Sequence, residues 1–337
     1  MQIGIHSIYD TFNKANAIFD QKSYPIGEDL GYPFVLLAKK LRERGVSIDT
    51  LDQHQIDDFE KIIFLDLPIK NNTNLSRLHE KGIELFLVIL ESPIVKKDNW
   101  IIENHKFFKK VFTWNDDWVD NRKYIPLKLA NKIRSKVNDF PSSRNRMCTI
   151  IAGKKKNKDV RELYTERVKA IEWFEKNHPE DFDLYGIGWD MYTFSRPFSR
   201  FNRFTSLRKL LAKKYRTYKG TIVSKSEVLS KYNFSICYEN ALDIPGYITE
   251  KIFDCFFAGC IPIYLGAPNI ADFVPRNCFI DKRAFATYEE LYSYMKNMSI
   301  IDYQKHIDNI ELFISSSEIH LFSADCFTDT IIQHIDI

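Results

Sequence analysis

Short apolar runs alternate with helical patterns along both halves of the chain, and this alternation constrains the fold more than any other feature. In the first half, strands are predicted at residues 2–7, 47–49, 61–66, 84–90 and 110–113, with helices at 34–44 and 75–81. In the second half, strands are predicted at 148–152, 182–185, 234–238 and 261–265, with helices at 164–177, 225–232, 250–258 and from about 288 onward. This order predicts an α/β fold with parallel sheets covered by helices on both faces.

The length of 337 residues favours two domains. The stretch from Asn138 to Arg146 has no periodicity and contains turn-forming residues, so it is typical of a linker. We expect a first doubly wound, Rossmann-like domain over 1–140, a second over 141–310, and a helical tail over 311–337 that packs back on the first domain. Ligands bind beyond the carboxyl ends of strands in such sheets, which directs attention to Glu91.

Two doubly wound domains around a cleft occur in dehydrogenases, in binding proteins and in GT-B glycosyltransferases, and the fold alone does not choose among them. The dinucleotide pattern G-x-G-x-x-G is missing, because Gly186-Ile187-Gly188 lacks the third glycine. A nicotinamide enzyme is therefore disfavoured.

Charge and cysteine usage limit the partners and the compartment. The net charge of +3 is too small to indicate nucleic-acid binding, although Lys and Arg cluster at 154–158 and 200–219. A solvated face is the simpler interpretation of these clusters; attraction to the phosphates of a nucleotide-sugar or of an anionic membrane is the alternative. Phenylalanines interleave with arginines over 194–220, which leaves nucleic acid as a minor possibility.

Six scattered cysteines without a C-x-x-C pattern indicate reduced core residues. The chain starts directly with a predicted strand, without a charged leader, and nowhere do about 18 apolar residues run together. We expect a cytoplasmic protein, with peripheral contact at the inner face of the membrane left open.

The segment from Tyr232 to Gly266 is predicted as a strand, a polar loop, a helix and a second strand. Thr249 is a candidate N-cap, which places Glu250 and Lys251 in the first helical turn. A helix N-terminus attracts a diphosphate, Lys251 adds a full positive charge, and Glu250 can accept hydrogen bonds from sugar hydroxyls. An ordinary capped helix would show the same pattern.

This segment resembles the signature of the family 10 glycosyltransferases, the α1,3/α1,4-fucosyltransferases. The resemblance lies in Tyr232-Asn233-Phe234, Tyr238-Glu239-Asn240, Tyr247-Ile248-Thr249-Glu250-Lys251, Pro262 and Gly266-Ala267-Pro268. Weaker similarity extends upstream to Glu91-Ser92-Pro93, Phe112-Thr113-Trp114, Arg167 and Asp183-Leu184-Tyr185-Gly186. Three features depart from the family: the loop between Asn240 and Tyr247, an inserted segment over 194–220, and the lack of a heptad tail.

The resemblance implies a GT-B fold and an inverting α1,3-transfer of L-fucose from GDP-fucose to a GlcNAc-containing glycan, such as an N-acetyllactosamine-like or lipopolysaccharide acceptor. It implies Glu91 as the catalytic base. The implied donor-binding residues are Arg167, Tyr185, Lys225, Asn240, Tyr247, Glu250 and Lys251. A transferase for another nucleotide-activated sugar is the closest alternative, and a catalytically silent binding module is a further one that the presence of Glu91 disfavours.

No metal or other cofactor is expected. Asp181-Phe182-Asp183 formally matches a metal-binding D-x-D pattern, but both carboxylates lie at the amino end of a predicted strand, away from the ligand-binding edge. The eight histidines show no ligand spacing.

Overall fold

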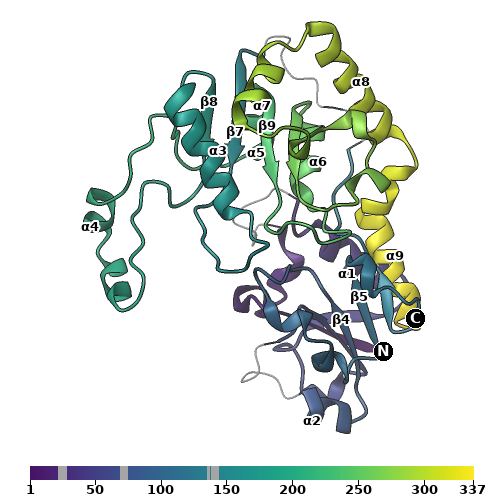
Figure 1. Ribbon diagram of the computed structural model, residues 1–337. Helices are drawn as coiled ribbons and strands as arrows, with labels where there is room; N and C mark the ends of the chain where they lie inside the picture. Colours follow the sequence, from purple (N-terminus) through teal and green to yellow (C-terminus); the bar gives the residue numbers. More distant parts are fainter. Residues whose placement is uncertain (22–28, 69–74, 135–136, 138–143) are drawn as a thin grey trace.

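The computed structural model describes residues 1–21, 29–68, 75–134, 137 and 144–337. They form two lobes, each built on one parallel sheet (Figure 1). The first sheet has the strand order β2-β1-β3-β4-β5-β6. Its strands are β1 (Gln2–Ser7), β2 (Ser47–Thr50), β3 (Lys61–Leu65), β4 (Glu84–Val88), β5 (Lys110–Thr113) and β6 (Tyr124–Pro126).

The second sheet has the order β11-β10-β9-β7-β8. Its strands are β7 (Arg146–Ile151), β8 (Phe182–Tyr185), β9 (Tyr232–Tyr238), β10 (Ile261–Leu265) and β11 (Ile280–Asp281). Helices α3 (Tyr164–Asn177), α5 (Lys225–Leu229), α6 (Glu250–Phe257), α7 (Tyr288–Lys296) and α8 (Ile300–Ser315) belong to the same lobe. Helix α4 (Thr205–Leu210) lies in a segment that projects from it (Figure 1).

Alternating side chains of each sheet enter separate cores on its two faces. In the first sheet, Ile63 and Phe86 face α1 (Tyr32–Glu43), whereas Ile62 and Phe64 face the side of α2 (Leu75–Glu80). In the second sheet, the cores pack against α6 and α8 on one face and against α3 and α7 on the other. The expected α/β architecture is thereby confirmed. All six cysteines lie in the described residues, form no disulfide, and are buried except Cys326.

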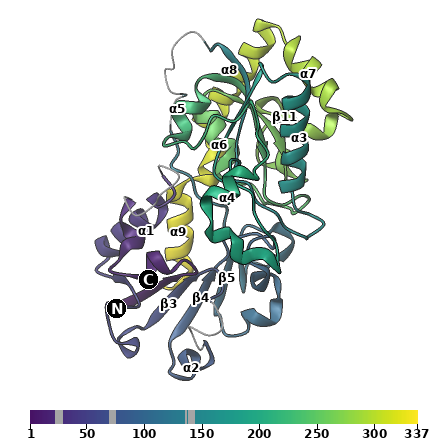
Figure 2. The same ribbon diagram turned by 90° about the vertical axis from the view of Figure 1, so that its left-hand side faces the viewer.

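The last helix, α9 (Ala324–His334), passes from the second lobe to the first (Figure 2). Phe327 and Ile331 lie in the same core as α1, and Lys40 of α1 forms ion pairs with Asp325 and Asp329 at 2.9 Å. The predicted linker falls mostly on residues 138–143, which lie outside the described residues, so the exact domain boundaries stay a prediction.

Loops at the carboxyl ends of the two sheets meet. The ring of Trp114, after β5, lies 4.6 Å from that of Tyr247, after β9. Gly246 has φ +78°, and a Cβ there would lie 2.1 Å from the carbonyl oxygen of Trp114, so only glycine allows this approach. The Asn269 amide adds a hydrogen bond to Asp116 at 2.9 Å. The two ligand-binding edges of the sheets therefore face each other.

Candidate active site

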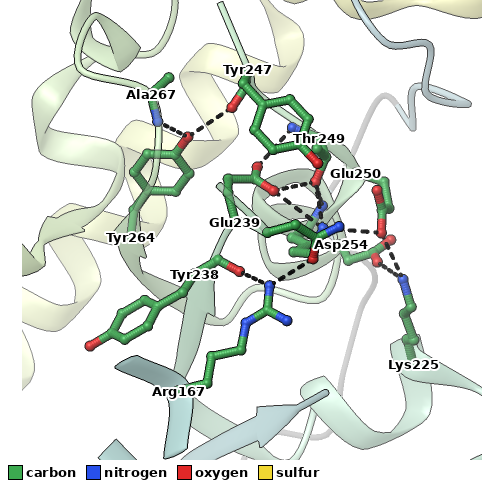
Figure 3. Close-up of polar contacts among 12 residues, drawn as sticks. Arg167, Lys225, Tyr238, Glu239, Tyr247, Thr249, Glu250, Asp254, Tyr264 and Ala267 are labelled. Atoms are coloured by element: carbon green, nitrogen blue, oxygen red, sulfur yellow. Dashed lines mark hydrogen bonds and ion pairs between the residues drawn. The ribbon is translucent and has the colours of Figure 1, made fainter. Parts of the chain in front are cut away.

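The N-terminus of α6 is held to the end of β9 by one buried carboxylate, that of Glu239. Glu239 is 0% exposed and accepts hydrogen bonds from the N–H and the hydroxyl of Thr249, both at 2.8 Å (Figure 3). It also accepts one from Lys251 Nζ at 3.2 Å. The Thr249 side chain accepts from the Lys251 N–H, which confirms the predicted N-cap. Lys251 is thus fixed at the first turn of α6, beside the positive end of the helix dipole.

Arg167 extends from α3 to the same place. Its Nη2 donates to the carbonyl of Tyr238 at 2.6 Å (Figure 3). The same nitrogen donates to Asn240 Oδ1 at 3.0 Å. The side chain is buried, which lowers the pKa of Arg167, but a guanidinium keeps its charge in proteins. Within the described residues, Nη1 and Nε have no hydrogen-bond partner, so these donors are available to an anion.

Three of the predicted donor-binding cations line one pocket of about 420 Å³, namely Arg167, Lys225 and Lys251. Asp254 lines it too, as do apolar and backbone groups at the ends of β7 and β9. A second pocket of about 620 Å³ shares Lys225 and Asp254, includes Glu250, and reaches first-lobe residues such as Asn131. The positive charge of Arg167, Lys225 and Lys251 in this pair of pockets suits a nucleoside diphosphate.

The side chains of α5 and α6 form a charge network across the pockets. Lys225 Nζ donates to Asp254 Oδ2 at 2.7 Å and to Glu250 Oε1 at 3.5 Å (Figure 3). Lys251 Nζ lies 3.8 Å from Glu250 Oε1. Burial opposes the charge of Lys251, but Glu239 and Glu250 outweigh it and raise the pKa of this lysine. Burial also opposes ionisation of Glu250. The positive charges of Lys251 and Lys225 outweigh the effect of burial and lower the pKa of Glu250. Lys251 and Glu250 are therefore both ionised at neutral pH.

Glu91 lies after β4 in the first lobe, and its position is set by a second buried carboxylate. Asp66 Oδ1 accepts the N–H groups of Leu90 at 2.8 Å and Glu91 at 3.0 Å, together with the Asn99 amide at 2.6 Å. Burial, followed by the charge of Glu91, raises the pKa of Asp66 to about 7. The Tyr9 hydroxyl donates to Glu91 Oε1 at 2.6 Å. Glu91 is partly exposed, as a base that meets a substrate must be.

Tyr164 and Tyr247 connect the two halves of the site. Burial raises the pKa of Tyr164, with Arg167 and Lys251 acting to lower it and Glu91 to raise it. Burial also raises the pKa of Tyr247, and Glu239, Glu91 and Glu250 add to the shift. Both tyrosines therefore lie within electrostatic range of the carboxylate of the first lobe and the charged groups of the second.

Two predicted donor-binding residues have other partners in the structure. Tyr185 does not line the pocket with the three cations; its hydroxyl lies 3.0 Å from that of Tyr232. The side chain of Tyr247 is buried against Trp114. A direct contact of either residue with a donor stays a prediction.

The two carboxylates of the D-x-D pattern, Asp181 and Asp183, are bound by other side chains of the protein. Asp183 receives a hydrogen bond from Tyr232 at 2.6 Å and ion pairs from Arg146 and Lys219, and Asp181 pairs with Lys296 at 2.7 Å. Within the part of the chain that the structure describes, no group of His, Cys, Asp or Glu side chains is arranged to hold a metal ion.

Sequence reasoning did not assign a role to Glu239, Asp66 or Tyr9. Glu239 stands inside the Tyr238-Glu239-Asn240 motif, so its position beside Asn240 was a usable signal. Asp66 directly follows a fully buried strand, where a carboxylate at the carboxyl edge is worth attention. Tyr9 has no local signal, because its partner is 82 positions away.

Two parallel sheets whose carboxyl edges face each other define the GT-B fold class. A crystal structure of an α1,3-fucosyltransferase superposes with a TM-score of 0.55 at 15% identity, covering 100% of this chain and 90% of that one. The structure of Anabaena HepE in complex with UDP-glucose gives a TM-score of 0.56 at 11% identity, covering 99% of both chains.

A sequence model described as glycosyltransferase family 10 (fucosyltransferase), C-terminal, matches residues 204–307. Helicobacter pylori α-(1,3)-fucosyltransferase FucT is 42% identical over 76 residues, which are 22% of this chain and 16% of that protein. An Arabidopsis thaliana α-(1,4)-fucosyltransferase is 40% identical over 70 residues, 21% and 17% of the two chains. The sequence similarity to family 10 thus lies in the second lobe, and the matched segments span less than a fifth of either relative.

Proposed function

We propose that this chain is an inverting fucosyltransferase that transfers L-fucose from GDP-fucose to a hydroxyl of a GlcNAc-containing glycan without a metal ion. One observation carries the proposal: in a chain whose second lobe matches the family 10 model, Glu91 of the first lobe and two cations of the second, Arg167 and Lys251, lie within electrostatic range of Tyr164.

The cations account for departure of GDP. As the bond between fucose C1 and the β-phosphate oxygen breaks, negative charge grows on that phosphate. Arg167 offers Nη1 and Nε, and Lys251 and Lys225 add point charges within the same pocket. Glu239 holds Lys251 in place through hydrogen bonds, and Glu250 can accept hydrogen bonds from ribose or sugar hydroxyls. These groups replace the divalent metal that other transferases use for the same charge.

Glu91 accounts for activation of the acceptor. Its carboxylate takes the proton of the acceptor hydroxyl while that oxygen forms the new bond to C1, on the face opposite the departing phosphate. This geometry inverts the configuration at C1. Tyr9 donates to Oε1 of Glu91 and leaves Oε2 for the acceptor proton. Because burial and Glu91 raise the pKa of Tyr9, its hydroxyl stays protonated and remains a donor at neutral pH.

The identity of the donor rests on the family match. A pocket with three cations binds the diphosphate of any nucleotide-sugar, so another donor is the alternative that the experiment must separate. An N-acetyllactosamine-like acceptor and a cytoplasmic location at the membrane surface belong to the same proposal, and both rest on the resemblance to the family.

A donor panel tests the proposal. Titration calorimetry with GDP-fucose, GDP-mannose and UDP-glucose should show tightest binding of GDP-fucose, and Lys251→Ala should weaken it by about tenfold or more, as expected for loss of a charge-assisted hydrogen bond. Lys231→Ala, an exposed lysine just before β9, is the matched control. The NMR spectrum of the product with N-acetyllactosamine should show α-linked fucose from the β-linked donor. Tightest binding of UDP-glucose, or a product of retained configuration, would refute the assignment.

A further inference from the structure

Residues 191–219, here called the arm, leave the second lobe and return to it at the carboxyl end of β8. Hydrogen bonds close its base: Lys219 N–H donates to Leu184 O at 2.9 Å, and the Tyr218 hydroxyl donates to Gly186 O at 2.9 Å. Figure 1 shows the arm, with α4, standing clear of both lobes.

The arm has a defined internal structure. Asn202 exchanges two hydrogen bonds with the backbone of Phe194, at 2.8 and 2.9 Å, and Arg208 Nε donates to Tyr192 O at 2.8 Å. The rings of Phe194 and Phe201 lie 5.7 Å apart. These contacts join residues of the arm to one another and involve no residue of the body of the protein.

Charge on the arm has a single sign. The arm contains nine cations and no carboxylate: Arg196, Arg200, Arg203, Arg208, Lys209, Lys213, Lys214, Arg216 and Lys219. Three of them pair with acids of the body: Lys213 with Glu172, Arg216 with Glu175 and Lys219 with Asp183. Arg208 is bound to backbone carbonyls. The other five have no carboxylate partner within the described residues.

Large apolar side chains are exposed among these unpaired cations. Phe198 is 58% exposed, Phe204 44%, Leu210 78% and Leu211 48%. The guanidinium of Arg203 lies over the ring of Phe204 at 4.7 Å, so a cation and an exposed apolar ring are direct neighbours on the arm. Exposed apolar groups surrounded by unpaired cations are typical of a surface that contacts a partner.

We propose that the arm docks the protein on an anionic membrane surface. Lipid phosphates attract the unpaired cations, and the phenylalanines and leucines enter the boundary between headgroups and acyl chains. Leu210 and Leu211 favour a bilayer over nucleic acid, because an aliphatic side chain has no ring on which a base can stack. Within the described residues, no helix is both long and apolar enough to cross a membrane. The arm emerges at the ligand-binding edge of the second sheet, so docking brings the cleft to the surface where membrane-borne glycans are anchored.

Vesicle co-sedimentation of the full chain tests the role of charge. The chain should bind vesicles of phosphatidylcholine mixed with phosphatidylglycerol, bind pure phosphatidylcholine weakly, and detach as sodium chloride is raised. The variant Arg200→Gln/Arg203→Gln/Lys209→Gln should lose affinity by roughly fivefold for each cation, about 100-fold in all at low salt.

A second variant tests the apolar contacts. Phe198→Ser/Leu210→Ser/Leu211→Ser keeps every cation and should still weaken vesicle binding by about tenfold or more. The control Lys106→Gln/Lys231→Gln/Lys305→Gln removes three exposed lysines outside the arm and should bind like the wild type. Equal loss in this control, or unchanged binding in either arm variant, would overturn the proposal.

Duplex DNA in a gel-shift assay provides the competing outcome. Tight DNA binding that the charge variant abolishes, with no binding to anionic vesicles, would assign the arm to nucleic acid and overturn the membrane proposal. Vesicle binding needs neither donor nor acceptor, so it succeeds or fails independently of the proposed fucosyl transfer.

Discussion

Replacing Glu239 by glutamine tests whether a buried carboxylate positions Lys251 for the donor. Glu239 is 0% exposed, and both of its oxygens are used: one faces the Thr249 N–H, and the other faces the Thr249 hydroxyl and Lys251. Glutamine has the same shape but offers one acceptor oxygen and one NH₂ donor. In one orientation of the glutamine amide, its NH₂ group faces the Thr249 N–H; in the other, it faces Lys251 Nζ. In both cases two hydrogen-bond donors face each other.

The magnitude follows from these contacts. Removing one partner of a buried ion pair costs about 3 to 5 kcal/mol, so the free energy of unfolding of Glu239→Gln should fall by that amount. Lys251 also loses the group that holds it in the donor pocket. A charge-assisted hydrogen bond contributes about 1.5 to 3 kcal/mol, so the affinity for GDP should drop roughly 10- to 150-fold.

A double-mutant cycle with Lys251→Met separates the two effects. Urea unfolding gives the stability of each variant, and titration calorimetry with GDP gives the affinity. If Glu239 acts on the donor through Lys251, Glu239→Gln should weaken GDP binding in the wild type and have little further effect in Lys251→Met. An equal loss of affinity in both backgrounds, or no loss in either, would refute the reasoning.

Three further predictions concern other contacts of the site. In urea titrations, Gly246→Ala should lower the free energy of unfolding by at least about 2 kcal/mol more than Gly45→Ala does. The backbone angle φ is similar at both positions (+78° and +74°), but only Gly246 lies against the carbonyl oxygen of Trp114. Equal effects of the two substitutions would contradict the close approach. Arg167→Lys should weaken GDP binding, measured by calorimetry, by about tenfold or more. An ammonium group cannot bind Tyr238 O, Asn240 and a phosphate at once, as the forked guanidinium can. Wild-type affinity in this variant would contradict a role of Arg167 in binding the phosphate. Asp66 has a pKa of about 7 in the folded chain, against about 3.9 when unfolded, so the folded state binds this proton more tightly. Therefore, as pH rises from about 4 to 7, the free energy of unfolding of the wild type should fall by about 4 kcal/mol relative to that of Asp66→Asn, and it should fall no further above about pH 7. Chemical denaturation of both proteins at a series of pH values measures this difference. A difference that does not change with pH would contradict the prediction.

Elements with strong periodicity and clear ends were predictable from the sequence. The strands at 182–185 and 261–265 and the helix at 164–177 have the predicted bounds. The helix expected at 225–232 ends at Leu229, because Tyr232 already belongs to β9. Strands β6 and β11 were not predicted, since segments of three and two residues show no period and form only by pairing with a neighbouring strand.

The site was predictable where residues lie close in sequence. Thr249, Glu250 and Lys251 share one helical turn, so capping rules place them correctly. Asp66 and Tyr9 were missed because each contacts Glu91 from beyond the end of another strand, 25 and 82 positions away. Sheet order decides which strand ends become neighbours, and no local pattern contains that order.

Metal-free turnover with Glu91 as the base is the central claim, and GDP release from GDP-fucose in the presence of N-acetyllactosamine and EDTA tests it most directly. The wild type should release GDP at a rate that depends on the acceptor and is insensitive to EDTA. Glu91→Gln should lose about 10²- to 10⁴-fold in turnover while it still binds GDP, as expected for removal of a general base. The control Glu103→Gln, an exposed glutamate of the same lobe, should match the wild type. Wild-type turnover in Glu91→Gln, or loss of turnover on addition of EDTA, would contradict the mechanism.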